Sequence, residues 1–124
     1  MLSEHLSLEE RLQIEGQYDS SLQDTNKAIE VYRKLFALFP DNLNYGLRLA
    51  DEQRRVNSED ALKTVAALRR LPGPAADDPR IDMIESRAWI SNDYAKAQAA
   101  GRRAVEKGTA EGARLLVALS LIHI

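Results

Sequence analysis

The stretch Ala28-Ile-Glu-Val-Tyr-Arg-Lys-Leu-Phe-Ala-Leu-Phe-Pro-Asp-Asn42 decides the fold of this chain. Its apolar residues recur at steps of three and four, which places them on one stripe of a helix: Ala28, Ile29, Tyr32, Leu35, Phe36 and Phe39. Pro40 disfavours helical geometry at the residue before it, and Asp41-Asn42 supplies a new N-cap. The stretch therefore predicts an amphipathic helix over residues 24–39 and the start of a second helix at residue 42.

Similar signals predict helices on both sides of this stretch. Ser7 and Glu10 form a capping box ahead of a helix that ends between residues 17 and 21, with an apolar face of Leu8, Leu12 and Ile14. The helix over residues 42–56 is followed by a turn and cap that begin at Asn57. The next helix then has the apolar residues Ala61, Leu62, Val65, Leu68 and Leu71.

A proline-rich segment separates these helices from the C-terminal ones. Residues 72–79 contain three of the four prolines and are predicted to be the longest loop. Asp78 as N-cap and Pro79 at the first helical position begin a helix that runs to about residue 91. An alanine-rich helix over residues 94–107 follows. Gly108-Thr109 is expected to end it and to start a seventh helix, with Ala113, Leu116 and Val117 on its apolar face.

The composition limits the classes of function. The chain has 124 residues, of which 44% are hydrophobic and 29% charged, as is typical of one soluble helical domain. Its net charge of -2 creates no field that would attract polyanions, so nucleic-acid binding is not expected. The chain has no cysteine, and its two histidines, His5 and His123, do not assemble a catalytic or metal site. We expect no enzyme activity, no cofactor, no metal and no membrane span.

Three alanines mark an internal repeat. Ala28, Ala61 and Ala97 begin corresponding stretches that lie 33 and 36 residues apart, close to the period of about 34 residues in tetratricopeptides. The chain therefore resembles the tetratricopeptide-repeat family over residues 1–118. This resemblance implies an all-α fold of antiparallel helix pairs stacked as a right-handed solenoid, with units over about residues 8–42, 43–74 and 78–108 and a partial unit over 109–118. The alternative is an irregular helical bundle with a fortuitous spacing.

The resemblance also implies close packing inside each unit, with a small residue of the first helix against an alanine of the second. The expected pairs are Gly16 with Ala28 and Ala50 with Ala61. Tyr32 is similar to the aromatic residue that the family places four residues after that alanine. The third unit departs from the pattern, because Glu85 stands where a small residue is expected and Gly101 where the aromatic is expected.

A narrower resemblance suggests a larger parent protein. Residues 35–50, together with residues 68–72 and 78–82, look like the repeat region downstream of a serine/threonine-kinase or winged-helix domain in large bacterial regulators. The chain has no glycine-rich phosphate loop, catalytic-loop His-Arg-Asp or helix-turn-helix, so the parent's activity is not expected of this piece. Residues 119–124 are similar to the translated end of a sequencing adapter, which predicts a non-native tail. The alternative is a genuine apolar C-terminal helix.

The family resemblance implies a concave face that binds a protein or peptide. The positions that correspond to ligand-facing ones are Gln13, Gln17, Asn44, Asp51, Arg54, Arg55, Asp82, Ser86 and Trp89. Gln13 and Gln17 replace the lysine and asparagine of the family's carboxylate clamp, so that clamp is not expected. The predicted function is a non-catalytic interaction or sensory scaffold in a bacterial regulator, and the alternative is a spacer or self-association segment of a protein kinase. We expect a cytoplasmic location, or a periplasmic one if the parent has a membrane span upstream.

The remaining charged residues are expected to be solvated. The arginine doublets Arg54-Arg55, Arg69-Arg70 and Arg102-Arg103 are each interleaved with acids, which disfavours a phosphate-binding stripe. Paired carboxylates such as Asp51-Glu52 are adjacent in sequence and point to different faces of a helix or lie in caps. They are interpreted as surface charges.

Overall fold

The computed structural model describes residues 6–110, and this part of the chain is all-α, with no strand. It contains six α-helices, which are α1 (Leu8–Ser21), α2 (Thr25–Leu38), α3 (Leu43–Gln53), α4 (Ser58–Leu68), α5 (Pro79–Trp89) and α6 (Tyr94–Ala110). The all-α prediction is confirmed. Three features of the sequence lie outside the described residues: the two histidines, the tail over residues 119–124 and the apolar residues of the expected seventh helix.

Capping residues start the first five helices, and all of these caps except Asp24 were predicted. Ser7 and Glu10 form the capping box, with both backbone N–H groups 3.1 Å from the side chain that accepts from them. Each of the next four helices is capped by a side-chain oxygen that accepts from a backbone N–H of its first turn: Asp24, Asn42, Asn57 and Asp78. Local sequence therefore fixes where these helices begin.

Three segments differ from the prediction. The helix expected over residues 42–56 ends at Gln53, the last residue of α3. Within the expected loop, Gly73–Asp77 forms a 3-10 helix. Gly73 has a positive φ of 68°, which glycine adopts without strain and which lets the chain turn directly after Pro72. The expected end at Gly108-Thr109 is wrong, because α6 continues to Ala110. A glycine ends a helix where it takes a positive φ, and Gly108 keeps helical geometry.

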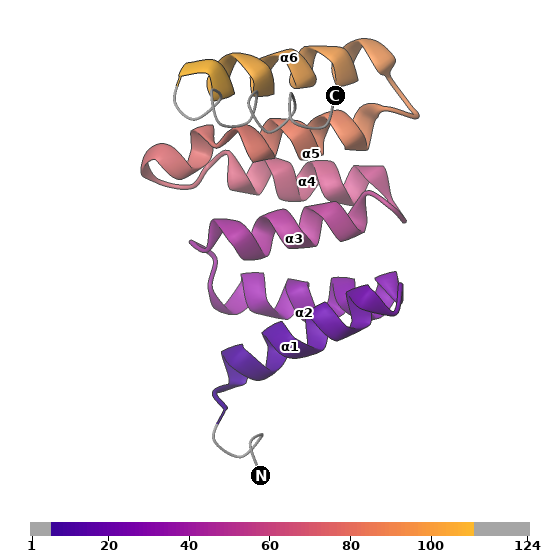
Figure 1. Ribbon diagram of the computed structural model, residues 1–124, viewed down its shortest axis with the longest axis vertical. Helices are drawn as coiled ribbons and strands as arrows, with labels where there is room; N and C mark the ends of the chain where they lie inside the picture. The colour runs from indigo at the N-terminus through magenta and orange to yellow at the C-terminus, as the bar shows by residue number, and fades with distance from the viewer. Residues whose placement is uncertain (1–5, 111–124) are drawn as a thin grey trace, which may run out of the picture.

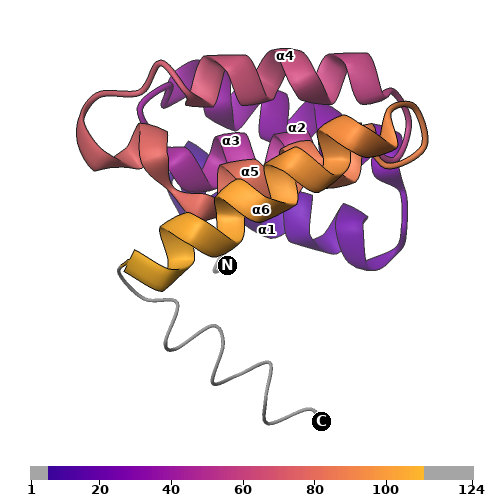
Figure 2. The ribbon, with the colours of Figure 1, turned by 90° about the horizontal axis from the view of Figure 1, so that it is seen from above.

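The six helices are stacked in chain order along the longest axis of the molecule (Figure 1). The most extensive contacts join the members of the consecutive pairs α1–α2, α3–α4 and α5–α6, and further contacts join each pair to the next. Viewed along the stack, α4 and α1 lie at opposite edges (Figure 2). Helices α3 and α5 also touch each other directly, although α4 separates them in the chain.

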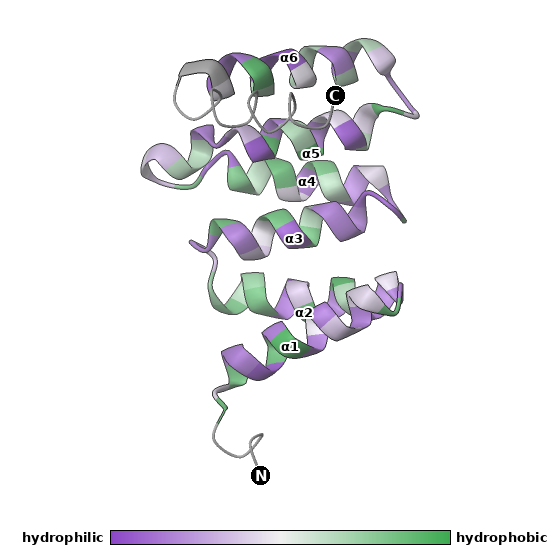
Figure 3. Ribbon diagram, viewed as in Figure 1, coloured by the Kyte–Doolittle hydropathy of each residue, from purple (hydrophilic) through white to green (hydrophobic). Residues whose placement is uncertain are grey.

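The large buried hydrophobic side chains form two clusters, and Phe36 contacts both. Each helix carries both hydrophobic and hydrophilic residues along its length (Figure 3). The first cluster contains Leu12, Ala28, Ile29, Val31, Tyr32, Leu35, Tyr45 and Leu49. The second contains Leu47, Ala50, Val65, Leu68, Ile81 and Ile84. Phe36 packs against both clusters, so the lower and upper parts of the stack share one apolar interior.

The apolar face predicted for the first helix is mostly exposed. Only Leu12 is buried, whereas Leu8 and Ile14 are 54% and 55% exposed. Gly16 packs against the ring of Tyr32. An added Cβ at Gly16 would lie 2.8 Å from Cζ of Tyr32, so the tyrosine ring is the group that requires a glycine there. The aromatic residue predicted for this unit therefore lies against Gly16.

The third helix pair packs through small residues and a hydrogen bond. The buried face of α6 is made of Ala97, Ala100 and Ala104. Ser86 of α5 donates a hydrogen bond of 2.7 Å from Oγ to the carbonyl oxygen of Ala97. Gly101 lies beside the same serine, with Oγ 3.5 Å from the position of an added Cβ. A glycine and a serine thus replace the aromatic packing expected of this unit.

Candidate functional site

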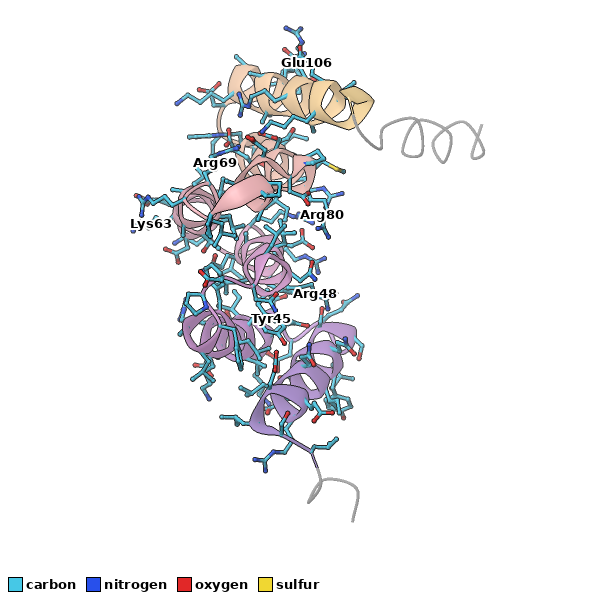
Figure 4. All side chains as sticks on the ribbon, turned by 90° about the vertical axis from the view of Figure 1, so that its left-hand side faces the viewer. Tyr45, Arg48, Lys63, Arg69, Arg80 and Glu106 are labelled. Atoms are coloured by element: carbon cyan, nitrogen blue, oxygen red, sulfur yellow. The ribbon has the colours of Figure 1, made fainter. Side chains whose placement is uncertain are left out.

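A groove of about 440 Å³ runs along the side of the stack formed by α1, α3 and α5. Its lining comes from these three helices, with Tyr32 of α2 at the base. The lining residues are Gln13, Gln17, Tyr32, Asn44, Tyr45, Leu47, Arg48, Asp51, Arg80, Met83, Ile84 and Arg87. Arg48 and Arg80 lie on this side of the stack, and Lys63 of α4 lies on the opposite side (Figure 4).

Four of the nine predicted binding residues line this groove. They are Gln13, Gln17, Asn44 and Asp51. The other five, Arg54, Arg55, Asp82, Ser86 and Trp89, are absent from the lining. The structure therefore brings together the residues predicted on α1 and α3 and separates them from those predicted on α5.

Asp82 was expected on the binding face, but its side chain is fully buried. One carboxylate oxygen accepts hydrogen bonds from Arg69 at 2.8 Å and Arg103 at 3.2 Å, and the other lies 2.8 Å from Nζ of Lys107. Burial by itself would raise the pKa of Asp82, but these three cationic partners together lower its pKa below the ordinary value. The expected ligand contact is replaced by an internal ion cluster.

Glu85 completes this cluster. Its two carboxylate oxygens accept from Arg69 at 2.6 Å and from Arg103 at 2.8 Å. We call Arg69, Asp82, Glu85, Arg103 and Lys107 the ion cluster; it joins the end of α4 to α5 and α6. Two of the three arginine doublets contribute to it, so the interpretation of these doublets as solvated charges is wrong for Arg69 and Arg103.

The side chains of Ser86 and Trp89 interact with α6. The hydroxyl of Ser86 donates to Ala97, as described above. Trp89 is half-buried, and Nζ of Lys96 lies 4.5 Å from the centroid of its ring. Arg54 follows the last residue of α3 and donates from Nε to Asp51 at 2.7 Å, while the exposed Arg55 lies beyond it. None of these four side chains provides a free recognition group in the groove.

Three arginines and one methionine of the groove wall were not predicted from the sequence. Arg48 lies between Asn44 and Asp51 at helical spacing, so all three occupy one face of α3. Arg80, Met83 and Arg87 follow the same three- and four-residue spacing on α5; together with Arg48 they line the groove. The spacing could have identified Arg48, because Asn44 and Asp51 on the same face of α3 were already predicted. It could not have identified the residues of α5, because the positions predicted there were Asp82, Ser86 and Trp89, which do not line the groove.

Hydrogen bonds and ion pairs between side chains connect the three groove helices. Between α1 and α3, the hydroxyl of Tyr45 donates to Glu9, and Ser20 donates to Glu52 at 2.6 Å. Glu52 is only 4% exposed, so its expected solvation is wrong. Desolvation first, and then Glu9, raises the pKa of Tyr45 to about 12, which keeps its hydroxyl protonated as a donor.

Between α3 and α5, the polar interactions involve arginines of the groove wall. Nη1 of Arg80 donates to Oδ1 of Asn44 at 3.3 Å, and Nη1 of Arg87 lies 3.6 Å from Oδ1 of Asp51. Arg80 also binds both carboxylate oxygens of Asp78, the N-cap of α5, which fixes its side chain at the upper end of the groove. The groove is therefore bounded by side chains held in defined positions.

Residues 6–110 contain no group of three or more His, Cys, Asp or Glu side chains placed to hold a metal ion. No helix in that part of the chain combines the length and the hydropathy required for a membrane span. No protein-family model matches the sequence, and no curated protein matches it.

Proposed function

We propose that the chain is a non-catalytic protein-interaction scaffold of tetratricopeptide type, which binds a peptide segment of a partner protein in the groove of α1, α3 and α5. The observation that carries the proposal is that three helices far apart in the chain contribute to one continuous concave surface. A ligand in this groove would contact every helix pair at once, which is the usual recognition mode of stacked helical repeats.

The chemical character of the lining favours recognition over catalysis. Tyrosine, arginine and methionine are the residue types enriched at protein interfaces, and the groove contains two tyrosines, three arginines and Met83. Asp51 is the one carboxylate that the described residues contribute to the lining, and it is held by Arg54 and Arg87, so it is not poised as a base. Among residues 6–110, the lining includes no histidine, lysine, serine or cysteine that could act as a nucleophile or proton carrier.

A self-association segment within a larger kinase or regulator remains the second candidate function. Ile14, Tyr18 and Leu22 follow one another at four-residue spacing on α1 and its C-cap, and each is more than half exposed. Such a stripe is suited to packing against another apolar helix. If this is the main function, Tyr18→Asp should abolish self-association of the chain in sedimentation, whereas changes in the groove should not.

The proposal can be tested by selecting random peptides that bind the 124-residue chain. Met83→Trp would fill the groove, because Met83 is a 40% exposed lining residue on α5. Leu38→Trp is the matched control, since Leu38 is 53% exposed on α2 and does not line the groove.

We expect selected peptides to bind the wild type and Leu38→Trp equally and to bind Met83→Trp at least about tenfold more weakly. Helical circular dichroism of each variant confirms that it is folded. A selection that yields no binding peptide, or peptides that bind Met83→Trp as well as the wild type, would refute the proposed function.

A further inference from the structure

The groove has a charge opposite in sign to that of the whole chain. Residues 6–110 contribute three arginines and one aspartate to its lining, whereas the complete chain has a formal net charge of -2. Local charge inside a concave site determines which ligand it attracts, because the surrounding protein limits screening by water. The groove is therefore an electropositive surface on an otherwise acidic protein.

Arg48 is the cation of the groove that is most available to a ligand. It is exposed, its Nη2 donates to the hydroxyl of Tyr32 at 2.9 Å, and its guanidinium lies 5.2 Å from the centroid of the same ring. No acidic side chain among residues 6–110 forms a salt bridge with it. Tyr32 thus orients the guanidinium without neutralising its charge.

Arg87 is the second available cation. Its side chain is 49% exposed, and its nearest carboxylate, Asp51, is 3.6 Å away. That carboxylate oxygen already accepts a shorter hydrogen bond of 2.7 Å from Arg54. Arg80 differs, because its Nε and Nη2 atoms bind Asp78 and its Nη1 atom binds Asn44. The guanidinium groups of Arg48 and Arg87 can therefore each bind a carboxylate of a ligand.

The neutral residues of the groove indicate the conformation of the ligand. Gln13, Gln17 and Asn44 present amide groups, which can donate to and accept from a peptide backbone. Oδ1 of Asn44 accepts from Arg80, and its NH₂ group can donate to a ligand. An extended peptide has free backbone groups to pair with such amides, whereas the backbone groups of a helix are already paired within the helix.

We propose that the groove selects an extended peptide segment rich in Asp and Glu, whose side-chain carboxylates are bound by Arg48 and Arg87. This inference rests on the proposed function and assigns the chemical class of the partner. Guanidinium groups bind carboxylates through paired, charge-assisted hydrogen bonds, which makes arginine the appropriate cation for this task. Binding weakens as the salt concentration rises, because the groove is open to solvent.

The test uses the peptides selected above, synthesised with an amidated C-terminus so that every carboxylate comes from a side chain. We expect them to be enriched in Asp and Glu relative to the starting library. Arg48→Gln and Arg87→Gln should each reduce affinity about tenfold in fluorescence titrations. Lys63→Gln is the matched control, because Lys63 lies on the opposite side of the stack (Figure 4), and it should leave the affinity unchanged.

Reversal of the charges on both arginines tests whether the charge of the groove selects the peptide. The double variant Arg48→Glu with Arg87→Glu should lose the acidic peptides and bind versions in which Asp and Glu are replaced by Lys. Circular dichroism and thermal melting of each variant show that it remains folded.

The possible failures are distinguishable. Peptides that need an open groove but show no acidic enrichment would overturn this inference and leave the proposed function intact. The inference is equally wrong if binding requires a free C-terminal carboxylate, or if a single-stranded oligonucleotide binds through Arg48 and no peptide does. If no peptide depends on the groove, the proposed function itself fails.

Discussion

At the scale of single residues, Gly46 is a position with no room for a side chain. A Cβ atom added there would lie 2.3 Å from Cδ2 of Leu68 and 3.0 Å from Cε1 of Phe36. Leu68 is fully buried, and Phe36 connects the two core clusters, so neither side chain can move away without disturbing the interior. Gly46 is therefore required by packing, since a helix otherwise favours alanine over glycine.

Gly46→Ala should lower the free energy of unfolding by about 1–3 kcal/mol, because the steric cost of overpacking exceeds the gain in helix propensity. Gly101→Ala is the matched control. Its added Cβ would make an ordinary contact of 3.5 Å with Ser86, so this variant should be more stable than the wild type by about 0.5–1 kcal/mol. Urea unfolding followed by circular dichroism measures both changes, and a stabilised Gly46→Ala would contradict this account of the packing.

The sequence allows prediction of individual residues only where the relevant pattern is local. Asn44 and Asp51 were predicted from their correspondence with ligand-facing positions of the family, and both line the groove. Asp82 could not, because its surroundings depend on Arg69 and Arg103, which come from other helices. A buried aspartate and a groove-facing aspartate have the same local sequence signal when they occupy the first turn of a helix.

At the scale of elements, the upper part of the stack is held together differently from the lower part. Helices α1 to α3 meet mainly through the first hydrophobic cluster. Helices α5 and α6 meet through small residues and also through the ion cluster. In this cluster the fully buried Asp82 binds cationic side chains from the end of α4 and from α6. Removal of one member of a buried ionic group is costly because the remaining charges lose their partner.

Asp82→Asn should reduce the free energy of unfolding at pH 7 by about 3 kcal/mol, the low end for a buried ionic group, because its cationic partners retain some solvent contact. The folded-state pKa of Asp82 is lowered, so its stabilising contribution is present above the unfolded-state pKa of about 3.9 and is lost as the pH falls toward the folded-state value. The difference between variant and wild type should therefore shrink at pH 3.

Urea titrations at pH 7 and pH 3 provide the measurement, and Asp77→Asn serves as the control. Asp77 is 87% exposed and lies 3.9 Å from Lys107, so this variant should differ from the wild type by less than about 0.5 kcal/mol at either pH. An equal loss for Asp82→Asn at both pH values would show that its charge is not the source of its stabilising effect.

The boundaries of elements were predicted best where a polar cap or a proline marks them. The starts of α2 and α5 agree with Asp24 and Asp78 because a capping side chain bonds to its own first turn and needs no distant partner. The exposure of Leu8 and Ile14 on α1 could not be read from their spacing, since it depends on which sides of that helix are covered. The weak amphipathic pattern of α1 was the only local feature that indicated this exposure.

At the scale of the whole molecule, stability is distributed unevenly along the stack. Helix α1 packs chiefly on α2 and contributes only Leu12 to the buried hydrophobic residues. Helix α3 packs between α2 and α4, and it buries Tyr45, Leu47, Leu49 and Ala50. Because each helix depends mainly on its neighbours, opening of the stack should cost least at α1.

Amide hydrogen exchange followed by mass spectrometry should show faster exchange in α1 than in α3 under native conditions. Leu12→Ala should accelerate exchange in α1 further and leave the exchange of α4 unchanged, because α4 has no contact with that side chain in the first cluster. If α1 and α3 exchange at the same rate in the wild type, the stack opens as one unit and the uneven distribution is wrong.

The contact between Lys96 and the ring of Trp89 has a practical consequence. Trp89 is the single tryptophan of the chain, so all of its indole fluorescence originates at the interface of α5 and α6. Separation of these two helices removes the ammonium group from the ring and admits water, which changes the emission. Far-ultraviolet circular dichroism instead reports all helices together. Comparison of the two signals during denaturation would show, without any attached label, whether the α5–α6 interface outlasts the rest of the molecule.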